Sequence, residues 1–254
     1  MKSPLFQRKG IPFFSDKTDK DFQKDPYERY DPMVIRQSAL HLADQLWGQY
    51  PMQSILDFAH NYYPKERSVQ LLEVGSGLGR WIATLAQAYP QAECWGIDYS
   101  YQMLKQAQEF WVQGKSISID LSNKGLPQVG HLKGHQLDNL NFGLAKATDL
   151  PFDDHSQDLV LSSFLLDRLE EPHDGLLEMY RVLKSGGKLI LITPLNFDRA
   201  AHWEQLYPPT KVKHLLEQIG FGILDWQEKW MIEEPLDARG NLVVWNCLGL
   251  VGSK

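Results

Sequence analysis

The sequence predicts an α/β fold: a three-layer sandwich in which helices cover both faces of a seven-stranded, mostly parallel sheet. Short apolar segments alternate with amphipathic segments of helical period through the middle of the chain, which is typical of a parallel sheet. A glycine-rich turn at residues 75–79 joins the first strand directly to a helix. Two long segments with strand composition, residues 222–232 and 241–250, end the chain and predict an antiparallel last strand.

The first 68 residues are predicted to form an extension and a helical cap, ahead of a main domain over residues 69–254. Residues 1–24 are polar, with prolines and mixed charges, and are expected to wrap the surface or to be partly disordered. Apolar residues then recur at helical spacing from Met33 to Trp47, and a second short helix over residues 54–62 is stopped by Pro64. We therefore expect two helices that flank the main domain without a separate core.

The main domain is predicted to contain five parallel strands with helices between them. The strands are expected at residues 71–74, 92–98, 141–145, 158–162 and 188–193. Helices are expected at residues 80–89, 101–111, 175–184 and 210–219, each with its apolar residues on one face. Thr210 is a suitable N-cap for the last of these helices, and Gly186 and Gly187 are expected to end the helix before the fifth strand.

Residues 113–139 form an insertion between the second helix and the third strand. A connection that runs from a helix end to a strand start lies at the amino-terminal edge of a parallel sheet, whereas ligands bind at the carboxyl edge. We therefore expect this insertion to be a surface decoration or contact surface and not a substrate lid. His131 and His135 lie in it, and we interpret both as solvated and assign no metal.

Composition narrows the class of protein. A chain of 254 residues with 43% hydrophobic content can bury one good core. The formal net charge is −6 and no block of lysine and arginine occurs, which disfavours a nucleic-acid substrate. No apolar stretch approaches the roughly 20 residues that span a bilayer, and the amino terminus lacks the apolar core of a secretory signal. Cys94 and Cys247 fall in predicted strands, where we expect small buried side chains and, with them, a cytoplasmic protein.

The glycine turn carries the most specific chemistry. Gly75, Gly77 and Gly79 follow a strand that ends with Glu73 and Val74, so the third glycine comes one residue earlier than in the dinucleotide pattern G-x-G-x-x-G. A carboxylate before the turn would repel a pyrophosphate but suits an ammonium or sulfonium group. The second strand ends at Asp98, whose two oxygens can accept both hydroxyls of a ribose.

The pattern E-x-G-x-G-x-G with a strand-end Asp98 resembles the class I S-adenosylmethionine-dependent methyltransferases. The segments LPFDDHSQDLVLSS (residues 150–163) and LLEMYRVLKSGGKLILITP (residues 176–194) are similar to that family too, so the resemblance covers residues 71–250. It implies a Rossmann-like fold, S-adenosylmethionine as cofactor, S-adenosylhomocysteine as product and methyl transfer to a small molecule. The cofactor residues that it implies are Glu73, Gly75, Ser76, Gly77, Gly79, Asp98, Tyr99, Met103, Ala147, Thr148, Asp149, Ser162 and Ser163.

The sequence departs from the family pattern at the position that the resemblance implies for binding the adenine of the cofactor. Members of the family often carry an aspartate before the fourth strand that accepts a hydrogen bond from adenine N6, and Lys146 stands at that position here. A lysine ammonium group donates and cannot accept. Either Asp149 supplies the acceptor after a local shift, or the amino group is left to water. The amide of Ala147 can still donate to adenine N1.

The acceptor and the catalytic base are less defined. The sequence N/D-P-P-Y/F, found in enzymes that methylate amino groups of bases or glutamine amides, does not follow the fourth strand. Loops after carboxyl ends of strands offer Asp167, His173, His202 and Tyr207 as weak catalytic candidates. We expect the acceptor pocket to face Tyr27 and Tyr30 of the cap and to be lined by Phe197, His202, Trp203 and Tyr207. The alternative, that these aromatic residues simply pack against the cap, is equally expected. The pattern favours a small aromatic or apolar acceptor.

Two other functions stay open at this point. A non-catalytic binding or assembly module with the same fold is favoured by Lys146 alone, and the intact glycines, Glu73 and Asp98 argue against it. An NAD(P)-dependent oxidoreductase would share the strand-turn-helix unit, but Glu73 would face its phosphates. The sequence indicates neither the acceptor, nor the general base, nor the oligomeric state.

Overall fold

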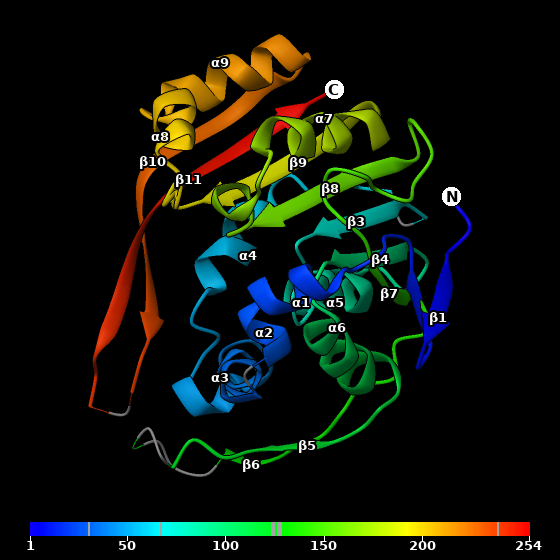
Figure 1. Cartoon of the computed structure of the whole chain (residues 1–254), viewed down its shortest axis with the longest axis vertical. Helices are drawn as coiled ribbons and strands as arrows, with labels where there is room; N and C mark the ends of the chain where they lie inside the picture. Colours follow the sequence, from blue (N-terminus) through cyan, green and yellow to red (C-terminus); the bar gives the residue numbers. More distant parts are fainter. Residues whose placement is uncertain (30, 67, 123–124, 126–128, 238) are drawn as a thin grey trace.

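The protein is a three-layer α/β sandwich built on one large mixed sheet (Figure 1). The computed structural model describes residues 1–29, 31–66, 68–122, 125, 129–237 and 239–254. Within these residues the sheet has nine strands in the order β1-β2-β7-β4-β3-β8-β9-β11-β10. Successive strand residues face opposite layers: Leu71 packs with α4–α6, and Leu72 packs with α7 and α9. Because both faces are buried, the central strands are rich in buried apolar residues, and several of their polar residues lie at the strand ends.

The predicted parallel strands are confirmed with small shifts at their ends. They are β3 (Gln70–Val74), β4 (Glu93–Asp98), β7 (Leu140–Leu144), β8 (Gln157–Ser163) and β9 (Leu183–Thr193). The terminal hairpin of β10 (Gly222–Pro235) and β11 (Leu242–Ser253) adds the antiparallel edge, since β11 pairs antiparallel with β9. All five parallel strands end at one edge, where the glycine turn and Asp98 lie.

The prediction of seven strands was wrong, because the amino terminus adds two more. Strands β1 (Phe6–Arg8) and β2 (Ile11–Phe13) form a hairpin, and β2 pairs parallel with β7 through Phe13 and Leu144. Ile11 and Phe13 are buried, so this segment neither merely wraps the surface nor lacks structure. The turn at Lys9 and Gly10 has positive φ at both residues (50° and 82°), as two-residue hairpins require.

The helices of the main domain are α5 (Arg80–Ala88), α6 (Tyr101–Ala107), α7 (Pro172–Val182), α8 (Ala200–Leu206) and α9 (Thr210–Ile219). Helix α6 continues into a π-helical turn, η2 (Gln108–Val112). Two predicted caps were wrong. Thr210 is the first helical residue after Pro209 and makes no capping hydrogen bond. Gly186 and Gly187 lie inside β9, because α7 ends at Val182 and the strand follows at once.

The cap consists of short helices in front of the carboxyl edge of the sheet (Figure 1). These are α1 (Asp19–Lys24), α2 (Pro26–Arg29), α3 (Asp31–Leu42), η1 (Asp44–Trp47) and α4 (Gln53–His60). Glu28 accepts from the Tyr101 amide at the start of α6, and Asp44 pairs with Arg80 at the start of α5. These contacts hold the cap over the edge where β3 and β4 end.

The insertion carries its own two-stranded ribbon, β5 (Ile117–Ile119) and β6 (Val129–Leu132). Ile119 and Leu121 are buried in a small cluster with Ala39 and Ala43 of the cap. The ribbon is therefore attached to the cap, in keeping with the contact surface that was one of the two alternatives for this insertion. Ile119 and Leu121 are apolar, and packing against Ala39 and Ala43 removes them from water.

Candidate functional site

The glycine turn between β3 and α5 has a backbone that only glycine adopts readily. Gly75, Gly77 and Gly79 have φ values of 78°, 51° and 70°, in the left-handed region. A Cβ on Gly77 would lie 3.3 Å from the Met103 methyl group, so this side chain packs closely on the turn. The absence of a Cβ at Gly77 thus lets the Met103 side chain approach the backbone of the turn.

Asp98 ties the turn to the tip of β4. Its two carboxylate oxygens accept hydrogen bonds from the amides of Gly77 and Ser100, each 2.8 Å long. Burial raises the pKa of this carboxyl, and the two amide hydrogen bonds act in the opposite direction. The side chain is only half-buried, and each oxygen has a further lone pair for a ligand hydroxyl. This geometry fits the predicted role in holding a ribose.

Glu73 is a buried acid under the same turn. It is 3% exposed, and its Oε2 accepts from the Ile82 amide at 3.0 Å. Burial raises the pKa of Glu73 to about 8, and the nearby charge of Asp98 adds to this rise. Two acids so close favour a cation between them. A ligand with an ammonium or sulfonium group would supply that charge.

The raised pKa of Glu73 has a consequence for stability. The folded protein holds a proton on Glu73 between the ordinary value of 4.5 and about 8, whereas the unfolded chain does not. The contribution of this group to stability is therefore fully present below pH 4.5 and falls as the pH rises toward 8, by at most about 1.4 kcal/mol per pH unit. Glu73→Gln removes this titration. We expect its melting temperature, relative to wild type, to increase steadily from pH 5 to pH 8.5 in calorimetry without ligand.

The matched control for this measurement is Glu217→Gln, an exposed acid on α9. Its difference from wild type should stay flat across the same pH range. A flat profile for Glu73→Gln as well would contradict the assignment of a buried, protonated Glu73.

The other predicted cofactor residues lie in α6, at the end of β8 and in the loops after β3, β4 and β7. Met103 and Ala147 are buried, Tyr99, Thr148 and Ser163 are half-buried, and Ser76 and Ser162 are buried. The hydroxyl groups of Ser76 and Ser162 have no hydrogen-bond partner within the part of the chain that the structure describes. Unsatisfied buried hydroxyls are unusual in proteins and are compatible with a ligand that completes their bonding.

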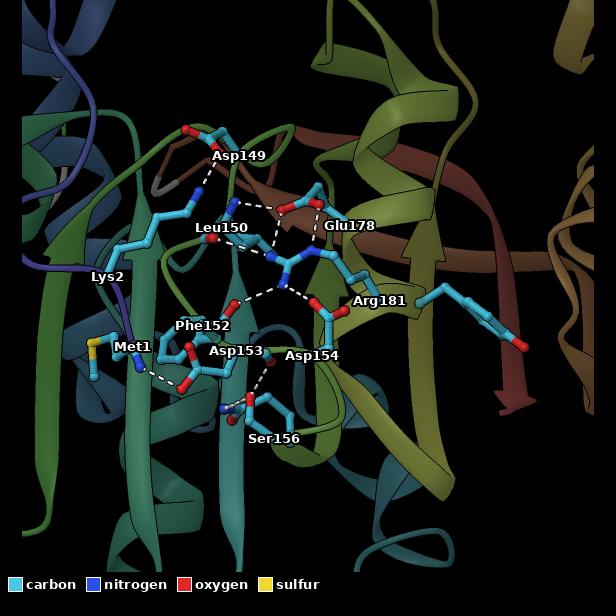
Figure 2. Close-up of polar contacts among 12 residues, drawn as sticks. Met1, Lys2, Asp149, Leu150, Phe152, Asp153, Asp154, Ser156, Glu178 and Arg181 are labelled. Carbon is cyan, nitrogen blue, oxygen red and sulfur yellow. Dashed lines mark hydrogen bonds and ion pairs between the residues drawn. The ribbon is translucent and has the colours of Figure 1, made fainter.

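Asp149 does not lie free at the adenine end. Its carboxylate is ion-paired with Lys2 on the exposed side of the loop, as Figure 2 shows. The same loop is held by Arg181, which donates to the carbonyl oxygens of Leu150 and Phe152 at 3.1 and 2.8 Å. Of the two alternatives for adenine N6, the structure therefore disfavours Asp149 as the acceptor.

The four weak catalytic candidates come from three segments of the chain. Asp167 is buried and accepts from the Thr193 hydroxyl at 3.2 Å, and burial raises its pKa. His173 is exposed beside Asp174 at the start of α7. His202 of α8 is buried, and Tyr207 at the end of that helix is 51% exposed. No hydrogen bond, ion pair or ring contact joins any two of these four described residues, so none of these interactions makes a catalytic pair of them.

The aromatic segment after β9 packs largely on itself. Phe197 is buried, with ring centroids 5.9 Å from His202 and 5.6 Å from Trp203. Trp203 donates from Nε1 to the Phe197 carbonyl at 2.7 Å and contacts Tyr207. The packing interpretation thus accounts for Phe197 and His202. Tyr27 lies half-buried against the core beneath the cap, and Tyr30 lies outside the described residues.

Sequence reasoning missed the residues that anchor the cap. The Lys17 ammonium group, with a side chain 1% exposed, donates to Asp25, Glu28 and the Tyr99 carbonyl oxygen at 2.8, 2.9 and 2.7 Å. Arg36 of α3 pairs with Glu234 of β10. These charged residues carry no motif, and their partners lie far along the chain, so no sequence signal identifies them.

The described residues hold neither a candidate metal site nor a helix that could span a membrane. Among the described residues, no group of three or more His, Cys, Asp or Glu side chains could hold a metal ion. No helix in that part of the chain is long and apolar enough to cross a membrane. Cys94 and Cys247 are free and buried as expected, and burial raises the pKa of both thiols to about 12.

Fold and site together define a nucleotide-cofactor α/β domain with two acids at its glycine turn. The chain belongs to the Methyltransferase domain family, whose model matches residues 65–234. This confirms the resemblance found in the sequence. Ajmaline N-methyltransferase of Rauvolfia serpentina is 26% identical over 64% of this chain and 48% of its own length. Demethylmenaquinone methyltransferase of a Geobacillus species is 27% identical over 60% of this chain and 61% of its own length. The chain thus spans less than two thirds of these relatives.

Solved structures show the same fold at low identity. A SAM-dependent methyltransferase from Aquifex aeolicus superposes with a TM-score of 0.53 at 21% identity, over 88% of this chain and 98% of that one. The [4+2]-cyclase SpnF superposes with a TM-score of 0.57 at 17% identity, over 87% of this chain and 95% of that one. Since one fold carries different chemistry, the reaction has to be argued from the site.

Proposed function

We propose that this chain is a cytoplasmic methyltransferase that uses S-adenosylmethionine as donor and a small aromatic or apolar molecule as acceptor. The observation that carries the proposal is the pair of acids at the glycine turn: Glu73 buried beneath it and Asp98 hydrogen-bonded to it. A ribose and an ammonium group on one ligand would satisfy both. The family to which the chain belongs, and the names of its relatives, support the same reaction.

The residues would divide the work of binding. Asp98 would accept the ribose hydroxyls, Glu73 would neutralise the amino group, and the turn at Gly75–Gly79 would let backbone approach the ligand. When bound, S-adenosylmethionine supplies an electrophilic methyl group on a sulfonium. The protein then has to align the acceptor behind that methyl and exclude water. A general base is needed only for an acceptor that is protonated at working pH.

The acceptor pocket is proposed over the tips of β8 and β9, beneath the cap. Phe164, directly after β8, has a strained φ of 53° and meets Trp245 of β11 at a centroid distance of 5.8 Å. Tyr27 of the cap lies near Asp98 and Glu234, whose charges both raise the pKa of its phenol after the larger effect of burial. Three aromatic side chains from cap, loop and hairpin thus support a flat or apolar acceptor. Trp203 and Tyr207 remain candidates for its outer rim.

Methyl transfer can be tested directly. Purified protein is incubated with S-adenosylmethionine labelled on the methyl group, and reduced demethylmenaquinone and ajmaline serve as acceptor probes. Label in either probe supports the proposal. Tight binding of NAD(H), with no calorimetric response to S-adenosylmethionine or S-adenosylhomocysteine, would contradict it in favour of the oxidoreductase. Binding of both adenosyl compounds without transfer to any acceptor would indicate the non-catalytic module.

Tyr27→Ala tests the pocket. We expect kcat/KM for the acceptor to fall about tenfold or more, because a truncated aromatic wall loses both area and orientation of the acceptor. The Kd for S-adenosylhomocysteine should stay within about twofold, because the side chain does not belong to the cofactor residues. Leu224→Ala, at an exposed position on β10, is the control and should change neither value. If kcat/KM for the acceptor and the affinity for S-adenosylhomocysteine fall equally in Tyr27→Ala, the side chain contacts the cofactor and not the acceptor.

A further inference from the structure

The family resemblance implies an aspartate that accepts from adenine N6, and Lys146 stands at its position, where an ammonium group only donates. The nearby Asp149 is ion-paired with Lys2 on the other side of its loop (Figure 2). An acceptor, if the chain has one, therefore has to come from another element that reaches Tyr99, the residue directly after Asp98.

The segment of residues 15–28, which we name the strap, lies on Tyr99. The Tyr99 hydroxyl donates to the Asp16 carbonyl oxygen at 2.9 Å and to Asp21 Oδ2 at 3.1 Å. From the other side, the buried Lys17 ammonium group donates to the Tyr99 carbonyl oxygen at 2.7 Å. Ser15 accepts from the Lys146 amide at 3.1 Å. The strap is thus fixed to both segments between which an adenine would lie.

Within the strap, Asp21 has one oxygen engaged and one open. Oδ2 accepts from the Thr18 amide at 3.0 Å, from the Thr18 hydroxyl at 2.8 Å and from Tyr99. No hydrogen bond to Oδ1 is found among the described residues, and the side chain is half-buried. The hydrogen bonds from Thr18 hold the pKa of Asp21 below its usual range, so the carboxylate is an acceptor only.

Lys146 lies beside the same tyrosine. Its Nζ is 5.4 Å from the centroid of the Tyr99 ring, and its charge makes a small contribution to the lowered pKa of Asp21. The cation at the unusual position and an acid of the strap therefore both meet Tyr99. Of the other acids on the strap, Asp25 and Glu28 are both bound by Lys17, Asp19 is exposed, and Asp16 meets Tyr99 through its backbone carbonyl oxygen. Among the described residues of the strap, Asp21 is the acid whose carboxylate accepts a hydrogen bond from the Tyr99 hydroxyl.

We propose that Asp21 is a specificity-determining residue for the base of the cofactor: its Oδ1 accepts a hydrogen bond from the 6-amino group of adenine. This inference rests on the proposed function, since it assumes that the adenosyl group lies along Asp98 and Tyr99. It moves the missing acceptor from the loop after β7 to the amino-terminal strap. A 6-oxo base would present an oxygen to the carboxylate, so the site should reject it.

Asp21→Asn keeps the shape and reverses the hydrogen bonding toward the base. The amide oxygen is expected to keep the bonds from Thr18 and Tyr99, so the NH₂ group faces the base and now suits a 6-oxo group. Calorimetry would compare S-adenosylhomocysteine with S-inosylhomocysteine on the full chain. Wild type should prefer the adenosyl compound by about 30-fold, because a 6-oxo base would set its oxygen against a carboxylate that can only accept. In Asp21→Asn this preference should fall below about threefold or invert. Asp19→Asn, an exposed acid on the same helix, is the matched control and should keep the wild-type preference.

Asp98→Ala distinguishes a failure of the role proposed for Asp21 from a failure of the proposed cofactor site. Loss of affinity for both compounds in Asp98→Ala, together with lost base preference in Asp21→Asn, supports the inference. Loss of affinity in Asp98→Ala with an unchanged preference in Asp21→Asn overturns the role of Asp21 and leaves the proposed function standing. No effect of Asp98→Ala on either compound overturns the cofactor site itself. A preference is a ratio measured on one sample, so partial unfolding of a variant cannot produce its inversion.

Discussion

Replacing Asp98 by alanine is expected to weaken binding of S-adenosylhomocysteine by about 30-fold or more, equivalent to about 2 kcal/mol. The carboxylate is the proposed acceptor for both ribose hydroxyls, and hydrogen bonds to a charged group are stronger than neutral ones. It also holds the Gly77 amide at 2.8 Å, so its loss loosens the turn that faces the ligand. Titration calorimetry of the purified variant measures the change.

The same variant should also be less stable without ligand. Asp98 accepts hydrogen bonds from the Gly77 and Ser100 amides, so alanine leaves two amides without their acceptor. We expect a loss of about 1–3 kcal/mol in the free energy of unfolding. Asp98→Asn, which keeps one acceptor oxygen, should lie between the two proteins in both measurements. Unchanged affinity with reduced stability would make Asp98 a structural residue.

The central sheet was predictable because its signals are local. The run at residues 71–74, the glycines after it and the strand-end Asp98 lie within a single βαβ unit, and each element was found within one or two residues of its position. The two acids of the site were predictable for the same reason, because strand ends at one edge bring Glu73 and Asp98 together. The raised pKa values of Glu73 and Asp98 were not predictable, because the burial of these two carboxyls depends on the cap that covers them.

The amino-terminal hairpin shows why other parts failed. Ile11 and Phe13 form a strand of three residues, too short for a periodic signal, and its partner β7 lies more than 100 residues away. Lys17 belongs to the polar segment of residues 1–24, which was expected to wrap the surface or to be partly disordered. In the structure it is buried, because the three oxygens of Asp25, Glu28 and Tyr99 replace its water. Neither contact can be found without knowing which distant segments meet.

The second large effect is expected for Gly79→Ala, at the last residue of the glycine turn, directly before α5. Gly79 has a φ of 70°, and a Cβ there would lie 2.5 Å from two ring atoms of Phe142. That ring is 1% exposed and also lies against Gly96, so it cannot move aside. Backbone strain and overpacking should together lower the free energy of unfolding by about 3 kcal/mol or more. Denaturation in urea, followed by circular dichroism, measures this loss.

Gly10→Ala distinguishes backbone strain from overpacking as the cause of the loss expected for Gly79→Ala. Gly10 has a similar φ of 82°, but a Cβ there meets no atom within 4 Å. This variant should therefore lose only the cost of the left-handed backbone, about 1 kcal/mol. Phe142→Leu in the Gly79→Ala background should recover part of the difference, because the smaller side chain relieves the contact. If Gly79→Ala costs no more than Gly10→Ala, close packing against Phe142 does not determine this glycine, and backbone conformation alone accounts for it.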